Sequence, residues 1–206
     1  MTAILKVDTI QDTSGNNIIN ESSDTITIGA SGDTIALAGT TVTGITQGIT
    51  NSQQWRITSA FTVGTSVTDV DSNWEISDAT GYATIGTALT ESSGIFSFPT
   101  TGIWLIMAYA NFRGNAGSRG VGWNLKATTN NSSYGFVSSA EVSNSDFGGS
   151  NNTTYHAGAI MGMFDVTDTT QVKFRFTTQA TGDTQTCDGD TTRNYTGFTA
   201  IRLGDT

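Results

Sequence analysis

Cysteine, proline and histidine each occur only once in the 206 residues, and charged residues make up only 13% of the chain. The single Cys187 excludes an intrachain disulfide framework and a site built from several thiolates, so we expect a small inert residue there. With one proline, the chain must reverse direction at Gly, Asn and Asp residues, and it has 24 glycines. Because soluble domains average about 25% charged residues, the surface must consist largely of Thr, Ser, Asn and Gly. This composition favours strands and turns over helices.

Basic charge is also scarce, because nine Lys and Arg residues face 18 Asp and Glu residues and give a net charge of −9. This balance repels phosphate backbones and anionic membrane surfaces, and the sequence has no basic cluster that would reverse the effect locally. No segment approaches the roughly 18 apolar residues of a membrane span, and the first residues lack the pattern of a signal peptide. We therefore expect no nucleic-acid partner, no membrane insertion and no export through a signal peptide.

Aromatic residues are missing from residues 1–50, whereas every Trp, Tyr and Phe lies from Trp55 onward. Within the first part, two consecutive nonamers, 22–30 and 31–39, each carry two aliphatic side chains on one face of a short strand. Burying such a pair yields about 3–6 kcal/mol, which does not offset an ordering cost of about 1–2 kcal/mol per residue.

Each nonamer must therefore stack on neighbours, and two copies are too few for a solenoid built from one chain. We predict a β-rich trimeric stalk over residues 21–50, with an interface that includes Ile26, Ile28, Ile35 and Leu37. The alternative is a flexible linker rich in Gly, Thr and Ser.

From residue 51 onward, short apolar runs alternate with Gly- and Asn-rich turns, which predicts an antiparallel β-sandwich. Residues 103–110 are apolar on both faces of the expected strand, and residues 156–166 show the same pattern. Such strands must be covered on both sides, by the opposing sheet on one side and by something else on the other. We predict that a partner subunit supplies this cover, with an interface that includes Leu105, Met107, Tyr109, Met161 and Met163.

Aromatic residues also lie beside the long Asn-rich loops, at Tyr134, Phe136, Phe147 and Tyr155. Exposed Tyr or Phe flanked by Asn and Asp is typical of carbohydrate-binding and protein-binding surfaces. The alternative is that Phe136 and Tyr155 are core residues of edge strands. The candidate receptor-facing residues are Asn131, Tyr134, Phe147, Asn152, Asp188 and Arg193.

Catalytic chemistry has little support in the sequence. A Ser-His-Asp or Cys-His set would have to be built around His156, and no Gly-x-Ser-x-Gly motif occurs. A carbohydrate-cleaving enzyme needs a pair of carboxylates in a cleft, but Glu75, Glu91 and Glu141 are widely dispersed. We therefore expect a protein that is not an enzyme, with a hydrogen-bonded strand histidine at position 156.

One loop groups three carboxylates, Asp183, Asp188 and Asp190. Oxygen-rich loops can hold calcium, but this spacing lacks the twelfth-position Glu of an EF-hand. We expect a solvated hairpin loop and no cofactor or metal, with calcium binding as the alternative.

The segments "GIFSFPTTGIWLIMAYANF", "VGWNLKATTNN", "FDVTDTTQVKFRF" and "YTGFTAIRLG" follow one another along the chain. Their order resembles the trimeric jelly roll shared by complement globular heads and tumour-necrosis-factor-like proteins. The signature residues are Phe98, Pro99, Gly102 and Trp104, with Trp104 standing where that family usually has Tyr. This resemblance covers roughly residues 55–206 and implies a tight homotrimer.

The segment "ILKVDTIQDTSGNNII", residues 4–19, resembles the N-terminal module of short fibre and appendage proteins of tailed bacteriophages. This resemblance implies a virion component that is attached to the particle through its first residues and leaves the cell by lysis. The expected virion anchor consists of Ile4, Leu5, Val7 and Ile10.

Together these features predict a virion-anchoring segment at 1–20, a stalk at 21–50 and a jelly-roll head at 51–206. The leading function is a trimeric appendage on the particle exterior that binds other virion proteins through its N-terminus and contacts a host-surface glycan or protein. The alternative is a trimeric decoration protein that stabilises the capsid.

Overall fold

The computed structural model describes residues 9–11, 13–15, 17–22, 25–28, 32, 34, 48–114, 118–143 and 153–206. The chain divides into two compact units, Met1–Thr46 and Gln47–Thr206.

The first unit contains a small antiparallel sheet of three strands in the order β1-β2-β3. The strands are β1 (Thr9–Gln11), β2 (Asn17–Ser22) and β3 (Thr25–Ile28). Strand β2 continues across residue 20, where the sequence analysis places the end of the anchor. The division of the chain into anchor, stalk and head stays a prediction.

The second unit, called the head below, is built from short and long strands without helices among its described residues. Its strands are β4 (Ser52–Ile57), β5 (Phe61–Val63), β6 (Thr68–Asp69), β7 (Trp74–Ile76), β8 (Thr90–Ser92), β9 (Ile95–Ser97), β10 (Gly102–Gly114), β11 (Ser118–Thr128), β12 (Gly135–Ser143), β13 (Thr154–Val166), β14 (Lys173–Gly182), β15 (Gln185–Cys187) and β16 (Gly197–Gly204).

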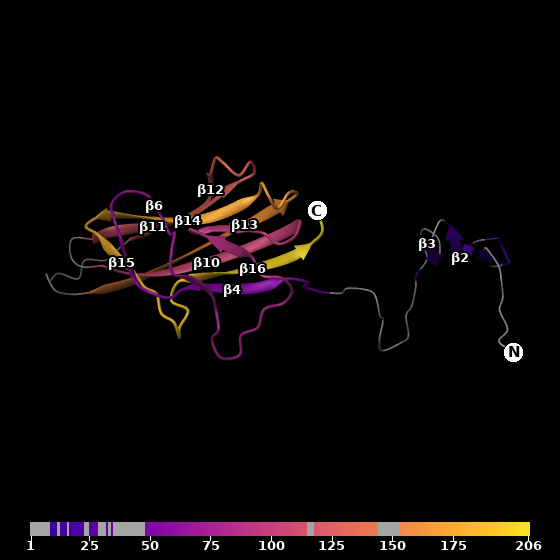
Figure 1. The fold of residues 1–206 in the computed structure, drawn as a ribbon, viewed down its shortest axis with the longest axis horizontal. Helices are drawn as coiled ribbons and strands as arrows, with labels where there is room; N and C mark the ends of the chain where they lie inside the picture. The colour runs from indigo at the N-terminus through magenta and orange to yellow at the C-terminus, as the bar shows by residue number, and fades with distance from the viewer. Residues whose placement is uncertain are drawn as a thin grey trace. The chain divides into compact units, whose positions relative to one another are not determined.

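These strands form two sheets that lie one above the other (Figure 1). The first sheet has the order β5-β15-β10-β16-β4-β7, with β13 paired to β10 along its whole length. The second has the order β12-β11-β14-β9-β8, with β6 paired to β14. All pairings are antiparallel, so the all-β class and the antiparallel sandwich predicted from the sequence are confirmed.

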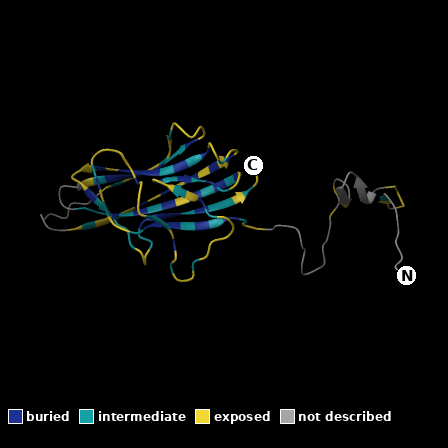
Figure 2. Ribbon diagram, in the orientation of Figure 1, coloured by how far each residue is buried: buried dark blue, intermediate teal, exposed yellow. Residues whose placement is uncertain are grey.

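The core lies between the two sheets, and Figure 2 shows buried segments in the strands of both. Aromatic rings dominate it. Phe96 is fully buried, with its ring centroid 4.8 Å from that of Phe198 and 5.1 Å from that of Phe174. Trp123 stacks on Phe176 at 4.9 Å. Such rings bury large apolar areas and pack in tilted and edge-on arrangements, which explains why the aromatic-rich part of the sequence forms the head.

Strand β10 alternates strictly between the core and the outer face of its sheet. Trp104, Ile106 and Ala108 are buried, whereas the residues between them point away from the second sheet. The strand begins at Gly102, whose φ of 132° favours glycine and whose missing Cβ leaves room for the Arg202 side chain. The register of β10 determines where the candidate site residues lie.

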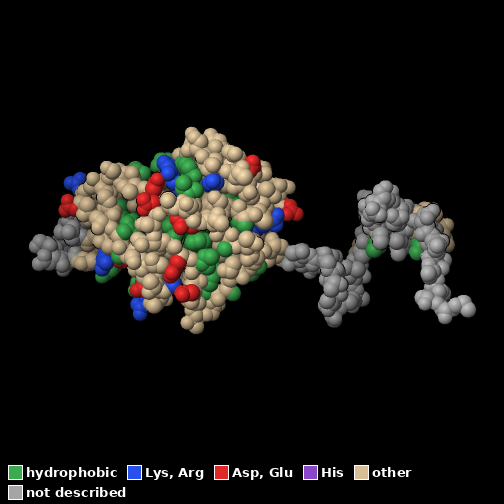
Figure 3. Space-filling view, in the orientation of Figure 1, with side chains coloured by type: hydrophobic (Ala, Val, Ile, Leu, Met, Phe, Trp, Pro, Cys, Tyr) green, Lys and Arg blue, Asp and Glu red, His purple; other side chains and the backbone are tan. Residues whose placement is uncertain are grey.

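The described residues contain no helix of the length and apolarity that a membrane span requires. Acidic and basic side chains are interspersed on the face of the head shown in Figure 3, over a surface that is otherwise mostly uncharged.

Candidate functional site

An apolar strip covers the outer face of the β10–β13 pair. In the antiparallel register Leu105 lies opposite Met163, and Met107 lies opposite Met161. The exposed fraction is 65% for both Met161 and Met163 and 38% for Met107. Tyr109 is half-buried on the same face, and burial raises the pKa of its hydroxyl above the ordinary value. These five residues form the apolar strip, and all five are predicted from the sequence to lie in the trimer interface.

The other predicted interface and anchor residues belong to the first unit. Ile28 is 52% exposed and Ile10 is 40% exposed. The side chain of Ile26 and all of Ile35, Leu37, Ile4, Leu5 and Val7 lie outside the described residues. Their assignments stay predictions.

Beyond Tyr109 the same face becomes polar. Asn111 and Arg113 follow on β10, and Tyr155 lies opposite Arg113 on β13. At this end of the head, a pocket of about 550 Å³ opens, within the range of small-ligand sites. The tip pocket, as it is called below, is lined by Ala60, Asn111, Arg113, Tyr155, His156, Ala157, Asp188, Gly189 and Tyr195.

An ion pair lies on the wall of the tip pocket. Arg113 Nε is 3.0 Å from Asp188 Oδ1, with side-chain exposures of 42% and 16%. The backbone N–H of Asp188 donates to the carbonyl of Asn111 at 2.8 Å, and that of Asp190 donates to the carbonyl of Ile57 at 2.9 Å. These backbone bonds fix the loop after β15 against β4 and β10, so the carboxylate of Asp188 is held in place.

The same loop is closed by local hydrogen bonds. Asp190 Oδ1 accepts hydrogen bonds from the hydroxyl and the amide of Thr192 and from the amide of Arg193. These bonds, those of Thr192 first, lower the pKa of the Asp190 carboxyl below its ordinary value. The Arg193 side chain donates to the hydroxyl of Tyr195 at 3.1 Å and so supports that ring beside the tip pocket.

His156 is not the hydrogen-bonded residue that the sequence analysis expects. Neither of its ring nitrogens has a hydrogen-bond partner among the described residues, and the ring stacks on Phe112 at 6.0 Å. Burial lowers the pKa of His156 below its ordinary value. Cys187 is buried and free, and burial raises the pKa of its thiol to about 12, so the reactive thiolate is not populated at neutral pH.

The three carboxylates of the predicted loop do not converge. Asp188 pairs with Arg113, and Asp190 accepts the local hydrogen bonds of its own turn. Within the described ranges no group of three or more His, Cys, Asp or Glu side chains is placed to hold a metal ion. The expectation that the loop binds no calcium stays a prediction.

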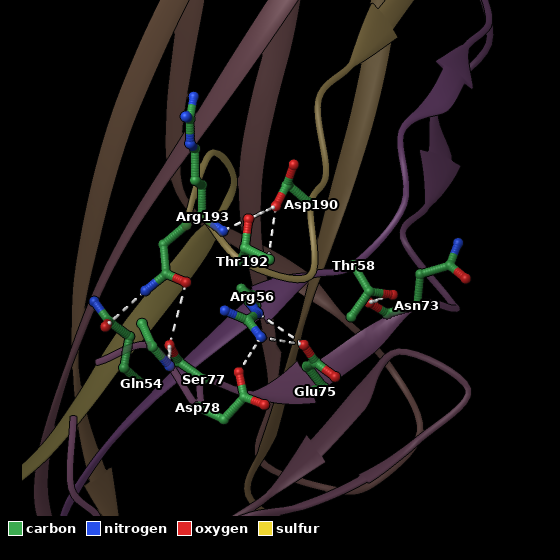
Figure 4. A network of polar contacts seen from close by, with 12 residues as sticks. Gln54, Arg56, Thr58, Asn73, Glu75, Ser77, Asp78, Asp190, Thr192 and Arg193 are labelled. Atoms are coloured by element: carbon green, nitrogen blue, oxygen red, sulfur yellow. Dashed lines mark hydrogen bonds and ion pairs between the residues drawn. The ribbon is translucent and has the colours of Figure 1, made fainter. Parts of the chain in front are cut away.

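A buried arginine lies close to this loop (Figure 4). The side chain of Arg56 is only 1% exposed, and its Nε donates to Glu75 Oε1 at 2.7 Å. It also pairs with Asp78, a residue whose side chain is 81% exposed. Burial opposes the charged form of Arg56, but the two carboxylates outweigh it and raise the pKa above its ordinary value. The Arg56 cluster therefore anchors β7 to β4 and has a structural role.

The candidate receptor-facing residues lie in different places. Asp188 lines the tip pocket and Arg193 follows it in the same loop. Tyr134 lies beside the second sheet, where the Arg175 guanidinium sits 4.3 Å from its ring centroid and also pairs with Asp69 at 2.7 Å. Asn131 has a φ of 52° in the preceding turn. Phe147 and Asn152 lie outside the described residues.

The two aromatic residues left open by the sequence analysis are both exposed. Phe136 is 62% exposed on β12, and Tyr155 is 72% exposed on β13. Neither is a core residue of an edge strand. Asn111, Arg113 and Tyr195 could not be assigned to a site from the sequence, because only the register of β10 and β13 and the β15–β16 loop bring them together.

No known family model matches the chain, and no curated protein is similar to it in sequence. Solved structures do match the head. Murine APRIL at pH 5.0 aligns with a TM-score of 0.50 and 14% identity, over 74% of this chain and 98% of that chain. Eiger TNF from S. frugiperda aligns with a TM-score of 0.50 and 14% identity, over 75% of this chain and 93% of that chain. At this identity the likeness shows the fold alone, which is a TNF-like jelly roll.

Proposed function

We propose that the chain is a non-enzymatic structural protein of a tailed-bacteriophage particle, in which a homotrimeric jelly-roll head is displayed for attachment to the host surface. The apolar strip is the observation that carries the trimer. Side chains of Leu and Met gain about 1.5–3 kcal/mol each when they are fully buried, so an uncovered row of them favours association. Methionine is unbranched and fills irregular gaps, which suits a close contact between subunits.

Three subunits are favoured over two by the resemblance of the head to trimeric jelly rolls, and the TNF-like fold supports that resemblance. The strip also lies on the sheet face that the core leaves uncovered. A closed three-fold arrangement covers the strip of every subunit. It leaves no uncovered contact surface to which further subunits could add and form a filament.

The virion role rests on the N-terminal resemblance and on the placement of the tip pocket. In the sheet register, Ser52 pairs with Ile201, and Ile201 pairs with Leu105. These residues lie at the end of the head where β4 begins and β16 ends. Arg113 lies eight residues farther along β10, which is about 25 Å at the rise of a strand. Figure 1 shows β15 and the C-terminus at opposite ends of the head. The chain therefore enters the head at the end opposite the tip pocket.

Sedimentation of the purified full chain tests the trimer. We expect a species of about three times 21.6 kDa, with no dissociation at micromolar concentration. A stable monomer at that concentration would remove the trimer and the stalk from the proposal.

Electron microscopy of phage particles labelled with an antibody against the head tests the location. Label on tail structures, together with reduced adsorption of particles that lack the protein, supports host attachment. Label at three-fold positions of the capsid with normal adsorption would instead support a decoration protein.

A further inference from the structure

We propose that the tip pocket binds a neutral sugar residue through vicinal hydroxyl groups. This inference rests on the proposed function, because it names the class of surface ligand that the head would contact. Three features that meet in one pocket support it. They are the Arg113–Asp188 ion pair, two tyrosine rings and the outer face of the β10–β13 pair.

The charge of the tip pocket favours a neutral ligand. Arg113 and Asp188 are paired at 3.0 Å, so their formal charges cancel. An anion would meet the carboxylate of Asp188 in a protein of net charge −9, and a cation would meet the guanidinium of Arg113. The charged residues that line the pocket therefore carry no net excess of one sign, whereas a phosphate or a metal ion needs such an excess.

The same pair suits hydroxyl groups. A carboxylate accepts hydrogen bonds and a guanidinium donates them, while each hydroxyl of a sugar both donates and accepts. Two adjacent hydroxyls can therefore bond to Asp188 and Arg113 at the same time. Hydrogen bonds to charged groups are stronger than those between neutral groups, so this contact supplies orientation as well as affinity.

The tyrosines supply the apolar part of the contact. Tyr155 is 72% exposed and lies beside Arg113 in the register, and the hydroxyl of Tyr195 is held by Arg193. An aromatic face packs against the C–H groups of a sugar ring, and the tyrosine hydroxyl remains in contact with water. Side chains on a sheet face line the pocket, whereas a peptide that adds as a strand would use a sheet edge.

One wall of the tip pocket is closely packed. Gly189 has no room for a Cβ, which would lie 2.6 Å from the backbone of Ser59, and this close approach holds the loop that carries Asp188. A wall that is already in place reduces the ordering cost of binding a small ligand.

Saturation-transfer NMR with the full-length protein tests the proposal. The probes are the methyl glycosides of glucose, mannose and galactose at millimolar concentration, with N-acetylneuraminic acid and inorganic phosphate as anionic probes. We expect transfer to at least one neutral glycoside and none to the anions. Transfer to no neutral glycoside, or only to an anion, would overturn the proposal.

Variants locate the binding. Tyr155→Ala and Asp188→Asn should each weaken binding of the neutral glycoside by about tenfold or more. Phe136→Ala, which removes an aromatic ring of similar exposure from the second sheet, should leave it unchanged. Because Tyr155 is exposed, its loss leaves the core intact, and thermal unfolding confirms the fold of each variant. Binding that survives Tyr155→Ala in a folded protein would place the sugar elsewhere and refute the tip site.

Sedimentation of the same samples separates the sugar site from the proposed trimer. A trimer that binds no glycoside would refute the sugar site alone. A monomer that binds a glycoside at the tip would refute the trimer and leave the sugar site standing.

Discussion

Met161 on β13 lies directly opposite Met107 on β10, and both side chains point away from the core of their own subunit. The pair forms the middle of the apolar strip. If the strip is covered by other subunits, a charge at this position would be buried without a partner, which is strongly unfavourable.

Met161→Glu should therefore convert the trimer into a monomer of about 21.6 kDa, while Met161→Leu should keep the trimer. Analytical ultracentrifugation gives the mass, and far-ultraviolet circular dichroism checks that the monomer remains folded. A charged variant that still sediments as a trimer would show that the strip is not the interface.

The contact between Arg56 and Glu75 leads to a second prediction. Glu75→Gln leaves the guanidinium of Arg56 buried with only the exposed Asp78 as a charged partner. Because Glu75 is itself 37% exposed, we expect a loss of about 1–3 kcal/mol in unfolding free energy rather than the larger value of a fully buried pair.

The matched control for Glu75→Gln is Asp205→Asn, which removes the partner of Arg202 at a position that is 93% exposed. This change should cost less than about 0.5 kcal/mol. Urea unfolding of the two variants gives both values, and equal losses would contradict the structural role assigned to the Arg56 cluster.

How much of this molecule can be predicted from sequence depends on whether a feature is local. The two-faced pattern of residues 103–110 predicts a strand that is covered by the opposing sheet on one face and by a partner subunit on the other. The structure confirms the strand and its core face at Trp104 and Ile106, while the cover on the other face stays a prediction. A continuous apolar run is a local property of the sequence, and strand geometry alone places its side chains alternately on the two faces. The jelly-roll resemblance is confirmed for the same reason, since its signature lies in consecutive segments.

The tip pocket could not be predicted in this way. Arg113, Tyr155 and Asp188 are separated by tens of residues, and only the pairing of β10 with β13 and the fixed loop after β15 bring them together. Register over long sequence distances is set by the packing of the whole sandwich. Tyr155 and Asp188 are singled out from the sequence by their loops, but nothing local predicts that they meet, and Arg113 gives no such signal at all.

His156 allows a prediction on pH, because it is the only histidine in the chain. Burial lowers its pKa in the folded state, so the unfolded state binds the proton more tightly. The contribution of neutral His156 to the unfolding free energy is therefore complete above the pKa of the unfolded state, about 6.5. It decreases as the pH falls below that value toward the lowered pKa of the folded state. Carboxylates protonate mainly near pH 4, outside this window.

The thermal midpoint of the wild-type protein should therefore decrease between about pH 7 and pH 5.5. In His156→Gln, which cannot titrate, this decrease should be absent. A wild-type midpoint that rises on acidification through this range would mean that the ring gains a partner when it is charged.

Gly189 gives a prediction on packing. A Cβ at this position would lie 2.6 Å from Ile57 Cγ2 and 2.6 Å from the Ser59 backbone. Gly189→Ala should destabilise the head by about 1–3 kcal/mol, because the backbone cannot yield without moving the loop that carries Asp188. The control is Gly135→Ala, where nothing lies within 4 Å of the added Cβ. Urea unfolding compares the two, and a Gly189→Ala protein as stable as the control would show that the loop is free to move.

The separation of the two compact units leads to the last prediction. In the described residues, β2 pairs with β1 on one side and with β3 on the other, and the head has its own core from Trp55 onward. Deleting residues 1–20 should therefore leave the thermal midpoint of the head unchanged. The protein should still sediment as a trimer, with a mass that is lower only by the mass of the deleted segments.

The same deletion should prevent the protein from joining phage particles if the first residues are the anchor, because the head then lacks its attachment to other virion proteins.

Tyr155→Ala should behave in the opposite way, since the substitution removes an exposed ring at the tip and leaves residues 1–20 intact. Particles that carry this variant should contain normal amounts of the protein but adsorb more weakly to the host. Immunoblotting of purified particles and adsorption assays measure the two effects. Normal incorporation of the truncated protein would show that attachment to the particle depends on another part of the chain.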